Sequence, residues 1–159
     1  MKHTIVRLTT KHLSKALLLR DQIFPGLNKA EYATLEASVR DLGNIKTKLG
    51  VDELHYWVAI DSDDTVHGII GLYSEIDDPK ERIWLGWYGV DETVRGSGLG
   101  GKLLDFAIHE SRCRGYEELK LYTTTADEYT AARRLYERKG FIDVTPSKKA
   151  KTRYYSLQC

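Results

Sequence analysis

A glycine-rich segment, "VRGSGLGGKLL" from Val94 to Leu104, contains the residue types that most directly suggest a binding site. Four glycines fall among the six residues from Gly96 to Gly101, and an apolar run with helical spacing follows at once. Glycine in the first turn of a helix costs conformational entropy, so we expect bare main chain to serve a purpose there. Successive N–H groups at a helix start can converge on a phosphate, helped by the helix dipole. The segment therefore predicts a phosphate-binding loop.

Two common nucleotide motifs match these glycines only in part. Gly96, Gly98 and Gly101 satisfy G-x-G-x-x-G, but that dinucleotide motif should begin where a strand ends, and an acid should close the next strand. Here other residues precede Gly96, and the next strand ends in threonines. The run from Gly96 to Lys102 also matches G-x-x-x-x-G-K, yet Leu103 replaces the Ser or Thr that holds magnesium. We therefore reject the dinucleotide motif. The second motif would make the protein a metal-dependent nucleotide hydrolase, which is improbable without the metal-binding residue. Magnesium-dependent binding of a nucleoside triphosphate would support that hypothesis again.

A third pattern, Arg95-x-x-Gly98-x-Gly100, follows an apolar strand and opens a helix. Its amides can hold a pyrophosphate without a metal ion, because the main chain itself supplies the positive ends of the dipoles. This pattern fits the segment best.

The elements that must position this loop can be predicted from hydrophobic periodicity and from glycine and proline breaks. Strands are expected at Thr4–Leu8, His55–Ile60, Val66–Tyr73, Arg82–Val90, Leu119–Thr123, Phe141–Val144 and Arg153–Gln158. Helices are expected within Leu13–Phe24 and Lys29–Leu42, from Leu99 to Gly115, and from a capping box of Thr125 and Glu128 to Gly140. The central strand–helix–strand unit implies a parallel crossover, and the hairpins imply antiparallel pairing. The fold class is mixed α/β (α+β), one domain over residues 1–159.

Composition and charge restrict the classes of binding partner and of cellular location that are expected. The formal net charge is +1, with acids and bases interspersed, so neither nucleic acid nor an anionic membrane is expected as a partner. The N-terminal apolar run is too short and too charged for a signal peptide or a membrane span. Cys113 and Cys159 show no paired spacing, which favours reduced thiols in a cytoplasmic protein. The five histidines lack metal-ligand spacing, so no metal site is expected.

At this point the chain resembles a known family. "VDETVRGSGLGGKLL" followed by "AARRLYERKGF" is similar to the paired signature of the GNAT superfamily of N-acetyltransferases, and the element order follows the GNAT fold. The resemblance implies a mostly antiparallel sheet with one splayed parallel strand pair and helices on both faces. It also implies transfer of an acetyl group from acetyl-CoA to a primary amine of a small molecule or a protein. Neither motif contains a cysteine, so direct transfer in a ternary complex is expected.

The resemblance also implies where acetyl-CoA binds. Main-chain groups near Tyr88 and Val90 would pair with the pantetheine arm, which lies between the strands Arg82–Val90 and Leu119–Thr123. A backbone N–H of the first strand would stabilise the developing oxyanion. The residues expected to hold the pyrophosphate are Arg95, Gly96, Ser97, Gly98, Leu99 and Gly100, with Arg95 adding its charge.

Three side chains are candidates for the chemistry. Tyr136 matches the family's tyrosine that protonates the departing thiolate, which a lowered phenol pKa would ease; otherwise it is a core aromatic residue. Tyr129 stands where the family often has an asparagine, and its phenol could replace some contacts to acetyl-CoA. The strand Arg82–Val90 lacks the acid that many relatives use as general base. Glu75 is the nearest substitute, acting through water, unless it is a solvated turn residue and ordered water alone serves.

The acceptor side is less defined. The resemblance places a variable acceptor region at residues Ile23–Tyr32, where Phe24, Leu27 and Tyr32 suggest a partly apolar pocket, and Trp84, Trp87 or Tyr88 could wall it. The basic run of Lys148, Lys149, Lys151 and Arg153 is either a solvated loop or steers an acidic substrate. The near-neutral charge speaks mildly against a strongly cationic polyamine. A non-catalytic acyl-CoA-binding sensor remains the alternative function, and a homodimer is possible.

Overall fold

The computed structural model describes residues 2–26, 29–40 and 45–159, and the helices and strands follow the order expected from the sequence. The strands are β1 (Thr4–Arg7), β2 (Val51–Ile60), β3 (Val66–Glu75), β4 (Arg82–Leu85), β5 (Gly89–Val90), β6 (Glu118–Thr124), β7 (Ile142–Asp143) and β8 (Thr152–Gln158). The helices are α1 (Leu13–Ile23), α2 (Lys29–Ala37), α3 (Ile45–Leu49), α4 (Leu99–Cys113) and α5 (Thr130–Arg138). Two short 3₁₀ turns, η1 (Glu92–Val94) and η2 (Asp127–Tyr129), precede α4 and α5.

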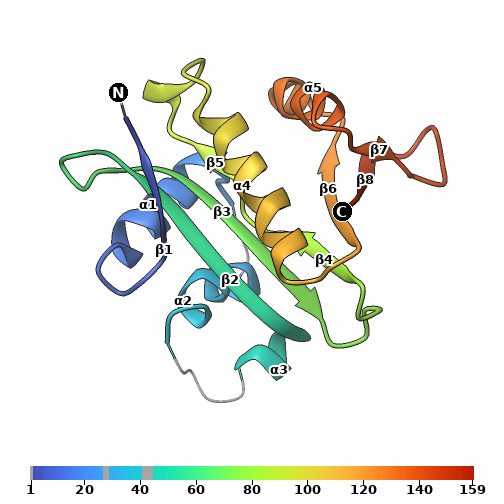
Figure 1. The fold of residues 1–159 in the computed structure, drawn as a ribbon, viewed down its shortest axis with the longest axis horizontal. Coiled ribbons are helices and arrows are strands. Elements are labelled where there is room, and N and C mark those ends of the chain that lie inside the picture. Colours follow the sequence, from blue (N-terminus) through green and yellow to red (C-terminus); the bar gives the residue numbers. More distant parts are fainter. Residues whose placement is uncertain (1, 27–28, 41–44) are drawn as a thin grey trace.

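All described strands belong to one sheet, in the order β1-β2-β3-β4-β6-β8-β7, with β5 pairing β3 beside β4 (Figure 1). Every pairing is antiparallel except that of β4 with β6. The parallel pair is the one that α4 connects, as a strand–helix–strand crossover requires. The predicted fold class, a mostly antiparallel mixed sheet with one parallel pair, is confirmed.

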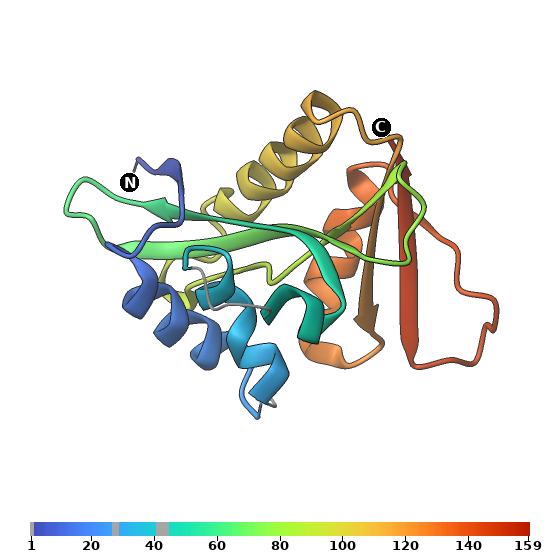
Figure 2. The ribbon, with the colours of Figure 1, turned by 90° about the horizontal axis from the view of Figure 1, so that it is seen from below.

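Helices cover both faces of the sheet. Figure 2 shows α1, α2 and α3 on one side and α4 on the other. The first side buries a cluster that includes Leu19, Leu35 and Ile69. The second buries a larger cluster that includes Leu103, Leu119 and the ring of Tyr136 from α5. The second cluster fixes α4 and α5 against the parallel strand pair.

The structure corrects several boundaries. The strand predicted over Arg82–Val90 is interrupted, because residues 86–88 leave the sheet between β4 and β5. The helix predicted within Lys29–Leu42 is α2, which ends at Ala37 inside that range, while Leu42 itself lies outside the described residues. The capping box does not form, since α5 begins at Thr130 and no side chain caps it. The short helix α3 was not predicted.

The two parallel strands separate beyond their first residues. Their pairing runs only from Arg82 opposite Glu118 to Trp84 opposite Lys120. After that point β6 continues to Thr124 against β8, while β5 pairs only with β3. Figure 1 shows β5 and β6 lying apart. One edge of β5 and one edge of β6 are thereby left without a strand partner.

A tyrosine from β2 fills the space beside this separation. Tyr56 lies opposite Gly71 of β3, and its buried ring occupies the position that a side chain of Gly71 would take. A Cβ at Gly86 would lie 2.6 Å from the Tyr56 hydroxyl. Both glycines are therefore required by the close approach of this ring.

We expect Gly71→Ala to lower the free energy of unfolding by about 1–3 kcal/mol, because the added methyl group overlaps a ring that is buried on all sides. Urea denaturation measures the change. Gly101→Ala is the matched control, since its Cβ would meet only the flexible end of Lys139 at 4.0 Å, and alanine favours a helix. Equal stability of the Gly71→Ala protein and the wild type would contradict this view of the core.

Candidate active site

The glycine loop leads from η1 into α4 through two residues with left-handed backbone. Gly96 has φ of 80° and Gly98, the N-cap of α4, has φ of 88°. An L-residue rarely adopts this conformation, so glycine is needed at both positions for the turn itself. A Cβ built at either glycine meets no atom within 4 Å. A side chain at either position would therefore point into open space.

Hydrogen bonds inside the loop use only some of its amides. The amide of Arg95 donates to the carbonyl of Glu92 and that of Ser97 to the carbonyl of Val94, each at 3.3 Å. In the part of the chain that the structure describes, no group accepts from the amides of Gly96, Gly98, Leu99 or Gly100. These four donors stand at the positive end of α4, and the arrangement suits a diphosphate.

The side chain of Arg95 adds a cation beside the loop. It is exposed, and the described residues offer it no hydrogen bond or ion pair. The hydroxyl of Ser97, by contrast, donates to the carbonyl of Val94 and helps to close the turn. Of the predicted loop residues, Arg95 thus brings charge and Ser97 shapes the main chain.

Tyr88 connects the loop with the interrupted strand. Its hydroxyl donates to the carbonyl of Gly100 at 2.7 Å, so the side chain fixes the first turn of α4. For Tyr88 the sequence indicated main-chain contacts to the pantetheine arm and a possible place in the acceptor wall, but not this bond. Tyr88 precedes Gly100 by 12 residues, and nothing in the sequence around Tyr88 indicates this hydrogen bond.

The main chain of β5 turns toward the separation between the parallel strands. Asp91 donates its amide to the carbonyl of His67, at the β3 side. Successive residues of an antiparallel strand alternate in direction, so the N–H and C=O groups of Val90 point away from β3. Tyr88 has the same parity, and no described residue accepts from its amide. Both residues therefore offer main-chain groups to a ligand between β5 and β6.

Tyr136 lies beside Tyr88 in a cluster of aromatic rings. Its ring centroid is 6.1 Å from that of Tyr88, 6.0 Å from Tyr155 and 5.9 Å from Phe141. Burial raises the pKa of Tyr136 above its usual value, and the hydroxyls of Tyr155 and Tyr129 add to this. The site therefore does not lower the phenol pKa, which would have eased proton transfer; burial makes the phenol a weaker acid, and its hydroxyl keeps its proton.

The structure also places the two other predicted side chains. Tyr129 ends η2, is half-buried, and is close enough to influence the pKa of Tyr136. Glu75 is not brought to the site. It is exposed at the end of β3, where its amide donates to Asp78. The stretch of β3 from Gly68, opposite Val90, to Glu75 spans roughly 23 Å at about 3.3 Å per residue.

Several aromatic side chains lie on the face that carries α1 and α2. Trp87 stacks near Phe24 with ring centroids 4.9 Å apart, and its indole N–H donates to the hydroxyl of Thr34. Leu27 lies outside the described residues, and the side chain of Tyr32 is not described either. Trp84 contacts Tyr73, Tyr122 and Tyr154. These rings could wall the acceptor side, as the sequence suggested for Trp84 and Trp87.

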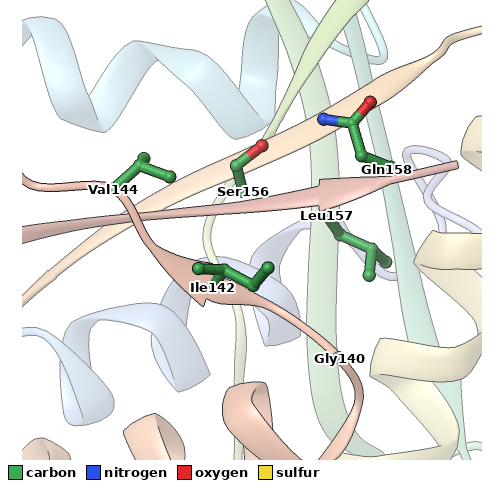
Figure 3. A pocket seen from close by; sticks show the side chains of 6 residues that line it. All are labelled: Gly140, Ile142, Val144, Ser156, Leu157 and Gln158. Atoms are coloured by element: carbon green, nitrogen blue, oxygen red, sulfur yellow. The ribbon is translucent and has the colours of Figure 1, made fainter.

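The basic run is only partly free. Arg153 binds Asp143 at 2.7 Å, and Lys148, Lys149 and Lys151 are exposed. A hollow of about 280 Å³ lies nearby, at the edge formed by β7 and β8 (Figure 3). Its lining residues are Gly140, Ile142, Val144, Ser156, Leu157 and Gln158, so none of the predicted site residues borders it.

The described residues offer neither a metal site nor a membrane-spanning helix. No group of three or more His, Cys, Asp or Glu side chains there could hold a metal ion. None of the helices described is long and apolar enough to cross a bilayer.

The geometry is thus a loop of free amides, a separated parallel strand pair and a buried tyrosine between them. A family model described as "Acetyltransferase (GNAT) family" matches residues 19–141. The chain belongs to the GNAT family of acetyltransferases. Among GNAT relatives, a spermine/spermidine N(1)-acetyltransferase of Bacillus subtilis is 30% identical over 124 residues, covering 72% of this chain and 81% of the relative.

Solved GNAT structures share the whole fold. A GNAT acetyltransferase of Staphylococcus aureus Mu50 superposes with a TM-score of 0.74 and 19% identity, covering 99% of both chains. The ribosomal-protein-S18-alanine N-acetyltransferase of Escherichia coli has a TM-score of 0.71 and 20% identity, covering 99% of this chain and 94% of its own. At such identities the likeness concerns the fold.

Proposed function

We propose that the protein transfers the acetyl group of acetyl-CoA to a primary amine, directly and within a ternary complex. The four free amides of the glycine loop carry this proposal, because they form a diphosphate site at the mouth of the separated strands. Acetyl-CoA, when bound, supplies the acetyl group as a reactive thioester.

The chain's own groups divide the work. The amides of Gly96, Gly98, Leu99 and Gly100 bind the diphosphate, with Arg95 beside them. Main-chain groups of Tyr88 and Val90 bind and orient the extended arm, as an added strand would. A free N–H at the interrupted strand, that of Tyr88, is placed to stabilise a developing oxyanion.

Tyr136 holds the proton that the departing thiolate needs. The amine loses one proton in the transfer and the thiolate gains one, and the Tyr136 hydroxyl is the donor for the second of these. Burial keeps this phenol protonated. Since Glu75 is exposed at the end of β3, ordered water is the better candidate for receiving the proton of the amine.

The raised pKa of Tyr136 has a consequence for pH dependence. A phenol whose pKa lies above its usual value of about 10 stays protonated at every lower pH. We expect kcat/KM to rise with pH as the amine becomes neutral, and to show no alkaline decline due to Tyr136 below about pH 10. An alkaline decline near pH 8 that disappears in Tyr136→Phe would contradict this assignment.

The acceptor is approached experimentally with a panel of amines. Release of free CoA thiol from acetyl-CoA is measured with spermidine and spermine, because a relative is named for them, and with amino acids and peptide N-termini. We expect at least one primary amine to be acetylated, with the product identified by mass spectrometry. Tight CoA binding without acetylation of any amine, and without an effect of Tyr136→Phe, would favour an acyl-CoA sensor instead.

A further inference from the structure

The interruption between β4 and β5 is held by a side chain two strands away. Gly86 still donates its amide to the carbonyl of Gly71, at 2.7 Å, as a sheet residue would. The next amide, that of Trp87, leaves this ladder and donates to the hydroxyl of Tyr56 at 3.2 Å. Tyr56 can reach this point only because Gly71 and Gly86 lack side chains.

The hydroxyl of Tyr56 is itself anchored. A side-chain hydrogen bond links it to Thr34 of α2, and the same Thr34 accepts from the indole N–H of Trp87 at 2.9 Å. Burial raises the pKa of Tyr56 to about 12, so the hydroxyl keeps the proton that this arrangement uses. Both N–H groups of Trp87, main-chain and indole, thus have fixed acceptors.

The interruption sets the orientation of the main-chain groups that follow it. Once the Trp87 amide is held outside the ladder, Tyr88 and Val90 present their free main-chain edge to the gap between β5 and β6. The Tyr88 hydroxyl then meets the carbonyl of Gly100, and its ring lies 6.1 Å from that of Tyr136. The orientation of all three groups depends on the same interruption.

We propose that Tyr56 is a positioning residue for acetyl transfer, whose hydroxyl fixes the interrupted strand so that the amide of Tyr88 is aimed at the reacting carbonyl. This inference rests on the proposed function. Without the hydroxyl, the amide of Trp87 lacks its acceptor, and the one extra residue between Gly86, which bonds Gly71, and Gly89, opposite Ile69, is no longer held by this bond. The chain can then continue the regular ladder from Gly86, in which Tyr88 rather than Gly89 faces β3. That change would rotate Tyr88 and Val90 away from the gap.

The test uses Tyr56→Phe, which keeps the ring that packs against Gly71 and Gly86. We expect kcat to fall about 10- to 100-fold, since a small misplacement of a reacting group has effects of this size. The Kd for CoA should change much less, because the free amides of the glycine loop lie between η1 and the first turn of α4, outside the interruption. Tyr116→Phe is the matched control, a half-buried tyrosine in the turn before β6, and should leave kcat unchanged.

A second measurement tests the inference without any turnover. Amide hydrogen exchange at Trp87, followed by NMR, should be faster by about tenfold or more in Tyr56→Phe and unchanged in Tyr116→Phe. Unaltered exchange at Trp87 would overturn the inference, as would an unaltered kcat. If the wild type acetylates no amine, the proposed function fails, while faster exchange would still show that Tyr56 holds the strand.

Discussion

Replacing Tyr136 by phenylalanine is expected to lower kcat by about 100- to 10,000-fold, the usual contribution of a positioned proton donor. The ring would remain in its cluster with Tyr88, Tyr155 and Phe141, so the fold and the binding of CoA should persist. Only the proton for the departing thiolate would be missing. Steady-state kinetics with a saturating amine, together with calorimetry for CoA, separate these effects.

Tyr155→Phe is the control for this variant. Tyr155 also buries its ring against Tyr136, at 6.0 Å between centroids, but it is not proposed to donate a proton. Its loss of one hydroxyl should change kcat only slightly. If Tyr136→Phe retained the kcat of the wild type, the proton would have to come from water, and Tyr136 would be a core residue.

Gly98→Val is expected to weaken CoA binding by about 100-fold or more. Valine rarely adopts φ near 88°, so the turn that presents the free amides would be strained, and its branched side chain would occupy space beside the loop that is now open. The loss of two hydrogen bonds between amides and a charged diphosphate accounts for an effect of this size. Calorimetric titration with CoA measures it.

Gly115→Val separates the effect on the ligand from backbone strain. Gly115 follows α4 at its other end, has φ of 84°, and also has no atom within 4 Å of its built Cβ. Both variants should lose similar stability, but only Gly98→Val should lose CoA. If Gly98→Val bound CoA as the wild type does, the loop would not be the diphosphate site.

The order of elements could be predicted from the sequence because its signals are local. Hydrophobic periodicity marks α4, and the glycines from Gly96 onward mark the loop that precedes it. Which amides of the loop are free and which are hydrogen-bonded could not be predicted. Whether an amide is free or already bonded, as at Ser97, depends on turn geometry that residue types alone do not determine.

The interrupted strand shows a different limit. Residues Arg82–Val90 read as one largely apolar strand, and Gly86 and Gly89 are the only local indications of a break. The cause is the hydroxyl of Tyr56, which comes from β2 and passes Gly71 of β3. Such a contact among three strands is invisible in any single segment.

The most direct test of the central claim follows the loop amides during a titration with CoA. In ¹⁵N-resolved NMR spectra recorded with a metal chelator present, we expect the amide signals of Gly96, Gly98, Leu99 and Gly100 to shift most strongly. The amides of Arg95 and Ser97, which already have acceptors, should shift less. Saturable binding of CoA that left these four signals in place would contradict the claim that bare main chain holds the diphosphate.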